Sequence, residues 1–271
     1  MLPIYYINVA ARTDRREHME QLFGKLSLRA TRFEALLPTD LPEELVERYC
    51  REDSPIKHGA SHLACSLSHY EVWRSFLETG AAAALIFEDD ALLSPELPQF
   101  LAQLGDGLPD GVDILKIETF GNTVRLSSRS KKIGYKYNIS RLFGNHFGAC
   151  GYIISHAAAE RLLDDPRHLD FLIDEYIFSR RSTVIFKHQI YQLNPALSIQ
   201  MSIYQKDNPS GPASSDLQFE RASGAQPVAA RGRWLRLREL APPAVRDLRY
   251  FAYDLKGLLG QRCPVPFAGD K

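Results

Sequence analysis

The sequence has few cysteines, no surplus of either charge and no long apolar run. Its four cysteines form no C-x-x-C pair and no cluster with metal-ligand spacing, a pattern typical of free thiols in a reducing compartment. Lysine plus arginine and aspartate plus glutamate each number 33, so no bulk charge indicates a nucleic-acid partner. Neither a signal peptide nor a membrane span of roughly 18–20 apolar residues is recognisable. These absences predict a cytoplasmic protein.

The 271 residues otherwise have the composition of an ordinary globular protein, with 45% hydrophobic and 24% charged residues. Apolar spacing predicts strands that alternate with helices, which indicates an α/β fold with a mostly parallel central sheet. Residues 118–147 are polar and aromatic and predict a long loop region with short strands. A strand pair or extended segment is expected at 184–193. The other expected strands are 3–9, 30–36, 81–87, 112–117 and 148–155, and the expected helices are 12–25, 41–49, 61–77, 95–104, 156–163 and 171–180.

Composition divides the chain into an α/β domain over 1–206, a linker or mobile loop over 207–230, and a basic amphipathic helical segment over 231–271. Between residues 231 and 262, eight lysines and arginines stand against three acids and alternate with aromatic residues and leucines. Two interpretations of this segment stay open. It could dock on an anionic membrane surface, or its apolar residues could pack on the rest of the protein while the arginines face water.

Three consecutive acids, Glu88, Asp89 and Asp90, follow the apolar run 81–87 at the end of an expected strand. Burying unpaired carboxylates costs free energy, so their position favours a bound cation or substrate. Alternation along an extended chain places Glu88 and Asp90 on one side and Asp89 on the other. Two acids on one side suit a hard divalent cation that also holds phosphates. The alternative is a solvated acidic turn.

Arginines follow the first expected strand at its turn into a helix. Asn8 closes that strand, and Arg12, Arg15 and Arg16 lie at the start of the helix. Helix amides and guanidinium groups both favour anions, so this turn is a candidate diphosphate site. The alternative is a solvated basic helix face. In the helix at 61–77, Ser68 and His69 are neighbours that do not face one another, so they form no nucleophilic pair, and a lone histidine there is more often structural.

Several motifs occur in a specific order along the chain: YYIN with RTDRR, then CSLSHYEVW, ALIFEDD, GACGYIIS with a downstream IDEY, and NPALSIQ. Together they resemble glycosyltransferase family 25 over about residues 3–205. The match departs at residues 61–64, where this chain has Ser-His-Leu-Ala and many members have Gly-Glu-Ile-Gly. Such departures leave the substrate more open than the reaction class.

The resemblance implies a GT-A type nucleotide-sugar-binding domain and an inverting hexosyl transfer from a UDP-sugar. The acceptor would be a hydroxyl of a lipooligosaccharide or another surface glycan, including lipid-linked ones. Galactose is the expected sugar, with glucose as the alternative, and Mn²⁺ or Mg²⁺ is the expected cofactor. A lipid-linked acceptor would place the cytoplasmic enzyme peripherally on the inner face of the plasma membrane.

By the same resemblance, the acid run corresponds to the Asp-x-Asp element of such enzymes. Asp90 would ligate the metal, and Glu88 would face the donor or share the metal. Asp89 would belong to the nucleotide site, together with the arginine turn. His188 and Gln200 are the two candidates for a further metal ligand.

An inverting displacement also needs a base that takes the proton of the acceptor hydroxyl. Asp174 is the expected base, and Glu175 and Asp170 are the alternatives. Two other functions stay open. One is a metal-dependent phosphohydrolase that uses the same acids on a phosphate ester, and the other is a non-catalytic homologue that binds a nucleotide sugar.

Overall fold

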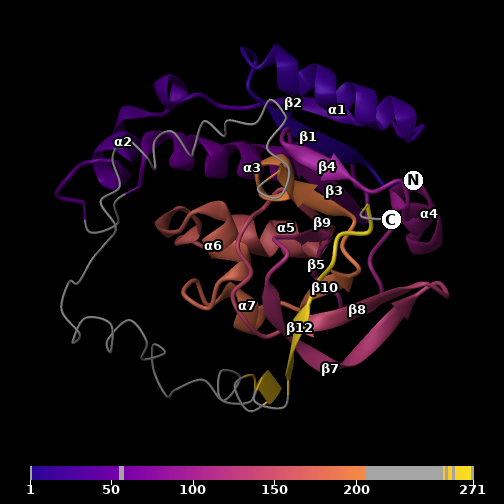
Figure 1. The fold of residues 1–271 in the computed structure, drawn as a ribbon. Coiled ribbons are helices and arrows are strands. Elements are labelled where there is room, and N and C mark those ends of the chain that lie inside the picture. Colours follow the sequence, from indigo (N-terminus) through magenta and orange to yellow (C-terminus); the bar gives the residue numbers. More distant parts are fainter. Residues whose placement is uncertain (1, 55–57, 206–252, 254–255, 258–259, 270–271) are drawn as a thin grey trace.

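The computed structural model describes residues 2–54, 58–205, 253, 256–257 and 260–269 (Figure 1). The expected linker at 207–230 and most of the basic segment at 231–271 lie outside these described residues. No helix in the described part of the chain is long and apolar enough to cross a membrane.

A nine-stranded sheet forms the centre of the molecule, in the order β12-β7-β8-β10-β5-β9-β3-β1-β2. β1, β2 and β3 are mutually parallel, and so are β5 and β10. β9 is antiparallel to both β3 and β5, so those two strands share a direction. The strands are β1 (Ile4–Asn8), β2 (Thr31–Glu34), β3 (Ala83–Glu88), β5 (Ile114–Lys116), β7 (Thr123–Ile133), β8 (Tyr137–Leu142), β9 (Gly151–Ser155), β10 (Ile190–Asn194) and β12 (Gln261–Pro264).

The expectation of a mostly parallel sheet is wrong, because the sheet is mixed. β7 and β8 form an antiparallel hairpin within residues 118–147, where a loop region with only short strands was expected. Neighbours joined by a short turn must be antiparallel, whereas parallel neighbours need a long crossover. The expected strand at 184–193 is also only partly right. Its first half is the helix α7 (Val184–Lys187), and β10 follows.

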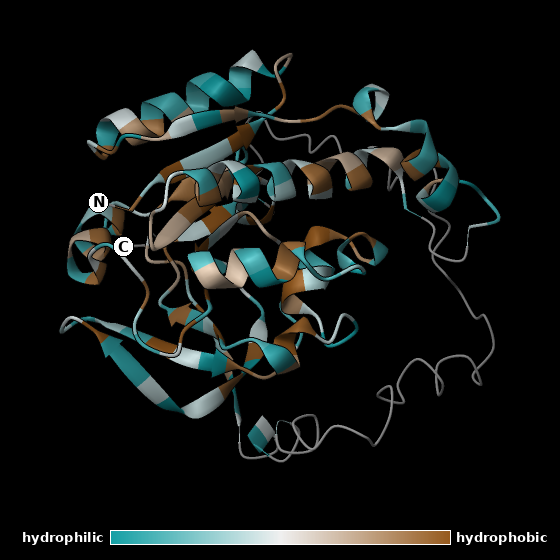
Figure 2. Ribbon diagram, turned by 180° about the vertical axis from the view of Figure 1, so that it is seen from behind, coloured by the Kyte–Doolittle hydropathy of each residue, from teal (hydrophilic) through white to brown (hydrophobic). Residues whose placement is uncertain are grey.

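Helices cover both faces of the sheet (Figure 1). One face packs against α3 and α5–α7, and the other against α1 and α4. Figure 2 shows that the outer helix α1 is largely hydrophilic, whereas the central strands are hydrophobic. The helices are α1 (Thr13–Lys25), α2 (Glu43–Tyr49), α3 (Ala60–Glu78), α4 (Leu97–Leu104), α5 (His156–Leu163), α6 (Ile173–Phe178), α7 and α8 (Met201–Tyr204), with 3-10 turns at η1 (Pro38–Asp40) and η2 (His168–Asp170).

Every residue from Ala83 to Phe87 in β3 is apolar because this strand is buried on both faces. Ala84 and Ile86 belong to the core under α3, and Leu85 and Phe87 to the core under α1. A strand with helices on both sides has no solvent-facing position, so it needs no polar alternation.

A second, three-stranded sheet lies beyond the carboxyl ends of β3 and β5, in the order β4-β11-β6. Its strands are β4 (Ala91–Leu93), β11 (Ser198–Gln200) and β6 (Glu118–Thr119). In its registers Gln200 pairs with Ala91, and Ser198 with Glu118. This small sheet therefore brings three distant parts of the chain to the end of the acid run.

The described end of the expected C-terminal segment belongs to the main sheet. β12 pairs antiparallel with β7, so that Gln261 lies opposite Leu126. Val265 and Phe267 are buried, and the hydroxyl of Thr119 donates to the Val265 carbonyl over 2.6 Å. Residues 261–269 thus pack as part of the α/β domain.

Candidate active site

The three acids lie where β3 ends and turns into β4. Glu88 is the last residue of β3, and Asp89 and Asp90 form the turn. The Asp90 carbonyl accepts the Met201 amide over 2.8 Å, which ties the turn to the end of β11. Oxygens of Glu88 and Asp90 and the sulfur of Cys150 all lie within 4.8 Å of one another. Glu88 and Asp90 thus share one side, as the alternation predicts.

Asp89 points the other way and is held by side chains from β1 and α1. Asn8 Nδ2 and an Arg15 guanidinium nitrogen each donate to Asp89 over 2.8 Å. Arg32 on β2 donates to Asn8 Oδ1 over 2.9 Å and completes the network. Arg32 was not among the predicted residues, and its place follows only from the parallel pairing of β1 with β2.

The three predicted arginines make different contacts in the described part of the chain. Arg12, just before α1, pairs with Asp14 over 2.9 Å. Arg16 pairs with Glu20 over 2.8 Å on the exposed surface of α1. Arg15 lines a cavity together with Asp89 and Asp90. Among these arginines, Arg15 thus contacts the acid run, and Arg16 lies on the exposed face of α1.

Two cavities meet at the acid run. The smaller has a volume of about 240 Å³ and the larger about 870 Å³. Both are lined by Cys65, Glu88 and Gln200, so these residues lie at the junction. Other residues of the smaller cavity include Val9, Arg15, Ala35, Leu36, Asp89 and Asp90. Other residues of the larger include His62, Phe120, His146, Phe147, Gly148, Asp174 and Glu175.

Carboxyl groups at this junction hold their protons more tightly than usual. Burial, with the nearby Asp174 and Asp89 charges, raises the pKa of Glu88 to about 7. Burial and the Glu88 charge raise the pKa of Asp90 to about 7, although Arg15 opposes the shift. A cluster of this kind is relieved either by a proton or by a metal cation.

A fully buried ion pair that was not predicted joins Lys116 and Glu118. Lys116 is fully buried at the end of β5, and its Nζ donates to Glu118 Oε2 over 2.8 Å and to the Gly148 carbonyl. Nζ also lies 4.2 Å from the centre of the Phe178 ring. Burial raises the pKa of Glu118 to about 7 even though Lys116 opposes it. The available signal was a lysine and a glutamate inside the apolar stretch VDILKIE, since buried charges need a reason.

Of the three predicted catalytic acids, two line the larger cavity. Asp174 lies in the first turn of α6 and faces the cavity beside Glu175. Glu175 is paired with Arg181 over 2.8 Å. Asp170 is not among the described residues that line the cavity, and its carboxylate accepts the Tyr49 hydroxyl over 3.3 Å.

The two predicted additional metal ligands lie at different ends of the sheet. Gln200 is at the junction, with its amide nitrogen 3.4 Å from Glu88 Oε2. His188 lies just before β10 and 3.8 Å from Asp113, which precedes β5. β10 and β5 are parallel, so both residues lie at the amino ends of these strands, whereas the acids lie at carboxyl ends. His188 is therefore not brought to the acids.

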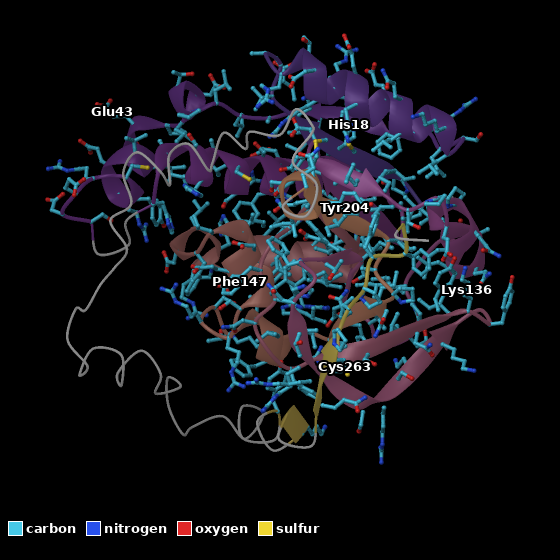
Figure 3. The ribbon with its side chains drawn as sticks, in the orientation of Figure 1. His18, Glu43, Lys136, Phe147, Tyr204 and Cys263 are labelled. Carbon is cyan, nitrogen blue, oxygen red and sulfur yellow. The ribbon has the colours of Figure 1, made fainter. Side chains whose placement is uncertain are left out.

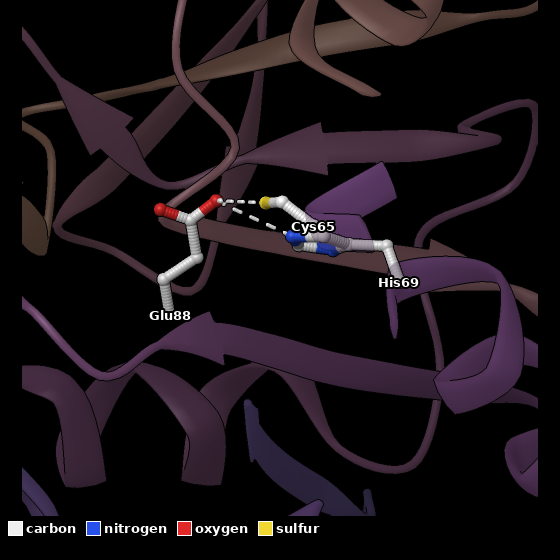
Figure 4. Close-up of side chains that lie close together, drawn as sticks. All are labelled: Cys65, His69 and Glu88. Atoms are coloured by element: carbon white, nitrogen blue, oxygen red, sulfur yellow. Dashed lines mark hydrogen bonds and ion pairs between the residues drawn. The ribbon is translucent and has the colours of Figure 1, made fainter. Parts of the chain in front are cut away.

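Cys65 and His69 lie one helical turn apart on α3, and both face Glu88 (Figure 4). The Cys65 sulfur is 3.9 Å and His69 Nε2 is 3.3 Å from Glu88 Oε1. Burial lowers the pKa of His69 to about 3, so the imidazole is neutral at physiological pH. A lone histidine on a helix is more often structural, but the i, i+4 spacing of His69 from Cys65 was a signal that both share one helix face.

The chain belongs to glycosyltransferase family 25 (LPS biosynthesis protein), whose family model matches residues 1–177. The resemblance predicted from the motifs is thus confirmed. Membership in this family does not favour the phosphohydrolase alternative.

Curated relatives cover most of the chain. It is 31% identical over 217 residues to the lacto-N-neotetraose biosynthesis glycosyltransferase LgtB of Neisseria meningitidis serogroup B, spanning 74% of this chain and 76% of that protein. It is 28% identical over 211 residues to the lipooligosaccharide biosynthesis protein lic2B of Haemophilus influenzae, spanning 75% and 78%. A solved glycosyltransferase involved in glycosylation of the major capsid of PBCV-1 aligns over 77% of this chain and 98% of its own, with 10% identity and a TM-score of 0.42, too low to carry an argument.

Proposed function

We propose that this glycosyltransferase moves a hexose, with galactose as the first candidate, from a UDP-sugar to a hydroxyl of a lipooligosaccharide glycan with inversion. The observation that carries the proposal is the junction of two cavities at Glu88. A transferase that joins two substrates needs two binding spaces that meet at the reacting groups. The names of the relatives support a lipooligosaccharide acceptor.

The donor would occupy the smaller cavity. Arg15 supplies a cation there for the diphosphate, and Ala35 and Leu36 supply an apolar wall for the uracil ring. β2, β1, β3, β5 and β10 share one direction, and the acids lie at their carboxyl edge, where α/β sheets bind ligands. This arrangement supports the proposed GT-A type of fold.

The residues at the junction suit a hard divalent cation such as Mn²⁺ or Mg²⁺. Glu88 and Asp90 offer carboxylate oxygens on one side of the turn. Glu118, whose Oε1 is buried and has no hydrogen-bond partner among the described residues, lies outside this group of ligand atoms. Oxygen donors are what these cations prefer. Such a cation, when bound, would stabilise the negative charge of the departing UDP.

Asp174 is the proposed base. Its Oδ2 accepts the Gly148 amide over 3.0 Å and its Oδ1 accepts the Glu175 amide over 2.8 Å, so the backbone fixes the carboxylate at the cavity wall. An acceptor hydroxyl in the larger cavity could pass its proton to a remaining lone pair of this carboxylate. The side chain of Glu175 is already engaged by Arg181, which makes it the weaker candidate.

The test is transfer from a panel of UDP-sugars by the purified full-length chain, with Mn²⁺ and with excess chelator. Asp90→Asn should abolish turnover while the protein stays folded, because this turn residue adds little to the core. Asp174→Asn should lower kcat with little change in donor KM, and Glu175→Gln is its matched control. Wild-type rates in chelator would refute the metal role. A dead Glu175→Gln beside an active Asp174→Asn would move the base to Glu175.

We also propose that the enzyme works at the cytoplasmic face of the plasma membrane and that the basic stretch 231–238 helps it bind anionic lipid. Arg231, Arg233, Arg236 and Arg238 supply the charge. Changing all four to Gln should weaken binding to anionic liposomes and leave transfer to a soluble acceptor unchanged. Equal liposome binding by both proteins would refute the proposal.

A further inference from the structure

A line of buried hydrogen bonds leads from the core to Glu88. Trp73 Nε1 lies 2.8 Å from the Tyr152 hydroxyl, and this hydroxyl lies 2.9 Å from His69 Nδ1. His69 Nε2 then lies 3.3 Å from Glu88 Oε1. The side chains of Trp73, Tyr152 and His69 are all fully buried.

The protons along this line can have only one arrangement that satisfies every group. The indole N–H of Trp73 can only donate, so the Tyr152 oxygen accepts it. Within the described structure the remaining partner of Tyr152 is His69 Nδ1, so the hydroxyl proton points there. A neutral imidazole that accepts at Nδ1 carries its proton on Nε2. His69 therefore donates Nε2–H to Glu88.

We propose that His69 is a positioning residue that holds Glu88 ready for the donor and acceptor. The hydrogen bond to Oε1, together with the Gln200 amide beside Oε2, fixes the plane of a carboxylate that both cavities share. Hydrogen bonds to a charged group are stronger than neutral ones, and a buried group held in place loses no freedom during reaction. The role of Glu88 in this inference rests on the proposed function, whereas the protonation of His69 does not depend on it.

The same geometry excludes a second use of these side chains. Cys65, His69 and Glu88 offer ligand atoms within 4.8 Å of one another, a mixed set that would suit Zn²⁺. A metal would need the Nε2 lone pair, and His69 would then have to donate from Nδ1 to Tyr152. The Tyr152 oxygen would accept two donors, and its own proton would have no acceptor in the described part of the chain.

Histidine ¹⁵N chemical shifts of the full-length protein test the protonation directly. We expect His69, assigned by comparison with His69→Gln, to be the neutral Nε2–H form and to be unchanged by added Zn²⁺. A Nδ1–H form or a doubly protonated ring would overturn the proposal. So would a Zn²⁺-induced shift that disappears in Cys65→Ser, because it would establish the metal site instead. This measurement needs no substrate and stays valid if sugar transfer is not the function.

Kinetics test the positioning role. His69→Leu removes the donor and should lower kcat about 10- to 100-fold, with donor KM within about threefold, whereas His69→Gln keeps an N–H and should recover most of the loss. His58→Gln is the control, since His58 is also buried but bonds the Leu169 carbonyl and does not line the described cavities. It should leave kcat unchanged. An equal loss of kcat in His69→Leu and His69→Gln, each with a wild-type melting curve, would contradict the proposal.

Discussion

Replacing Lys116 by Met should destabilise the protein strongly, because it leaves Glu118 without its counter-charge. Met keeps the apolar length of the lysine stem but has no donor for Glu118 Oε2 or for the Gly148 carbonyl. Both members of the pair are fully buried. Removing one partner of a buried ion pair costs about 3–5 kcal/mol in unfolding free energy.

The loss should depend on pH with a definite sign. The pKa of Glu118 is already raised to about 7 with Lys116 present, and without that charge it should rise further. A carboxyl whose folded pKa exceeds its unfolded value destabilises the fold as pH rises. The difference between Lys116→Met and wild type should therefore be larger at pH 8.5 than at pH 6 and should shrink as Glu118 takes up a proton.

Urea denaturation at the two pH values measures this difference. The double variant Lys116→Met/Glu118→Gln is the matched control. In the wild type, Glu118 Oε2 accepts a hydrogen bond from the Cys150 backbone N–H over 3.0 Å, and the side-chain carbonyl of Gln can still accept it without carrying a charge. This double variant should recover much of the lost stability. A single-variant loss below about 1 kcal/mol at both pH values, or a double variant no more stable than the single, would refute the reasoning.

Three further predictions concern other parts of the molecule. Burial lowers the pKa of His188 to about 4, below its value in the unfolded chain. The stability that the neutral, buried His188 contributes to the fold is therefore lost as pH falls from about 6.5 to about 4. His188→Gln should reduce the acid-induced loss of unfolding free energy by up to about 3 kcal/mol, which thermal melts at several pH values measure. The same variant should keep the metal dependence of transfer, and a loss of that dependence would restore His188 as a metal ligand. Phe147 is 51% exposed at the larger cavity (Figure 3), so Phe147→Ala should raise the KM for a glycan acceptor, about fivefold or more, and not that for the donor. A rise in donor KM alone would contradict the assignment of the cavities. Gly148 has φ +85°, and a Cβ there would lie 2.2 Å from Phe120, so Gly148→Ala should cost at least about 2 kcal/mol in chemical denaturation; near-wild-type stability would refute it.

Local patterns in the sequence were enough to predict the acid run and its faces. The run 81–87 is apolar at every position, which is what a strand buried on both faces requires, and the acids follow where the strand ends. Alternation along the extended chain placed Glu88 and Asp90 together and Asp89 apart, as the structure has them. The order of the motifs was also sufficient to predict the family.

Only the tertiary structure decided which distant side chains meet these acids. β9 lies antiparallel between β3 and β5, which brings Cys150 beside Asp90, and β6 pairs with β11, which brings Glu118 and Gln200 to the same edge. Periodicity reports which face of an element is buried, but strand order and register are set by contacts between elements far apart in sequence. For the same reason His188 looked like a ligand in the sequence and yet lies at the opposite end of β5.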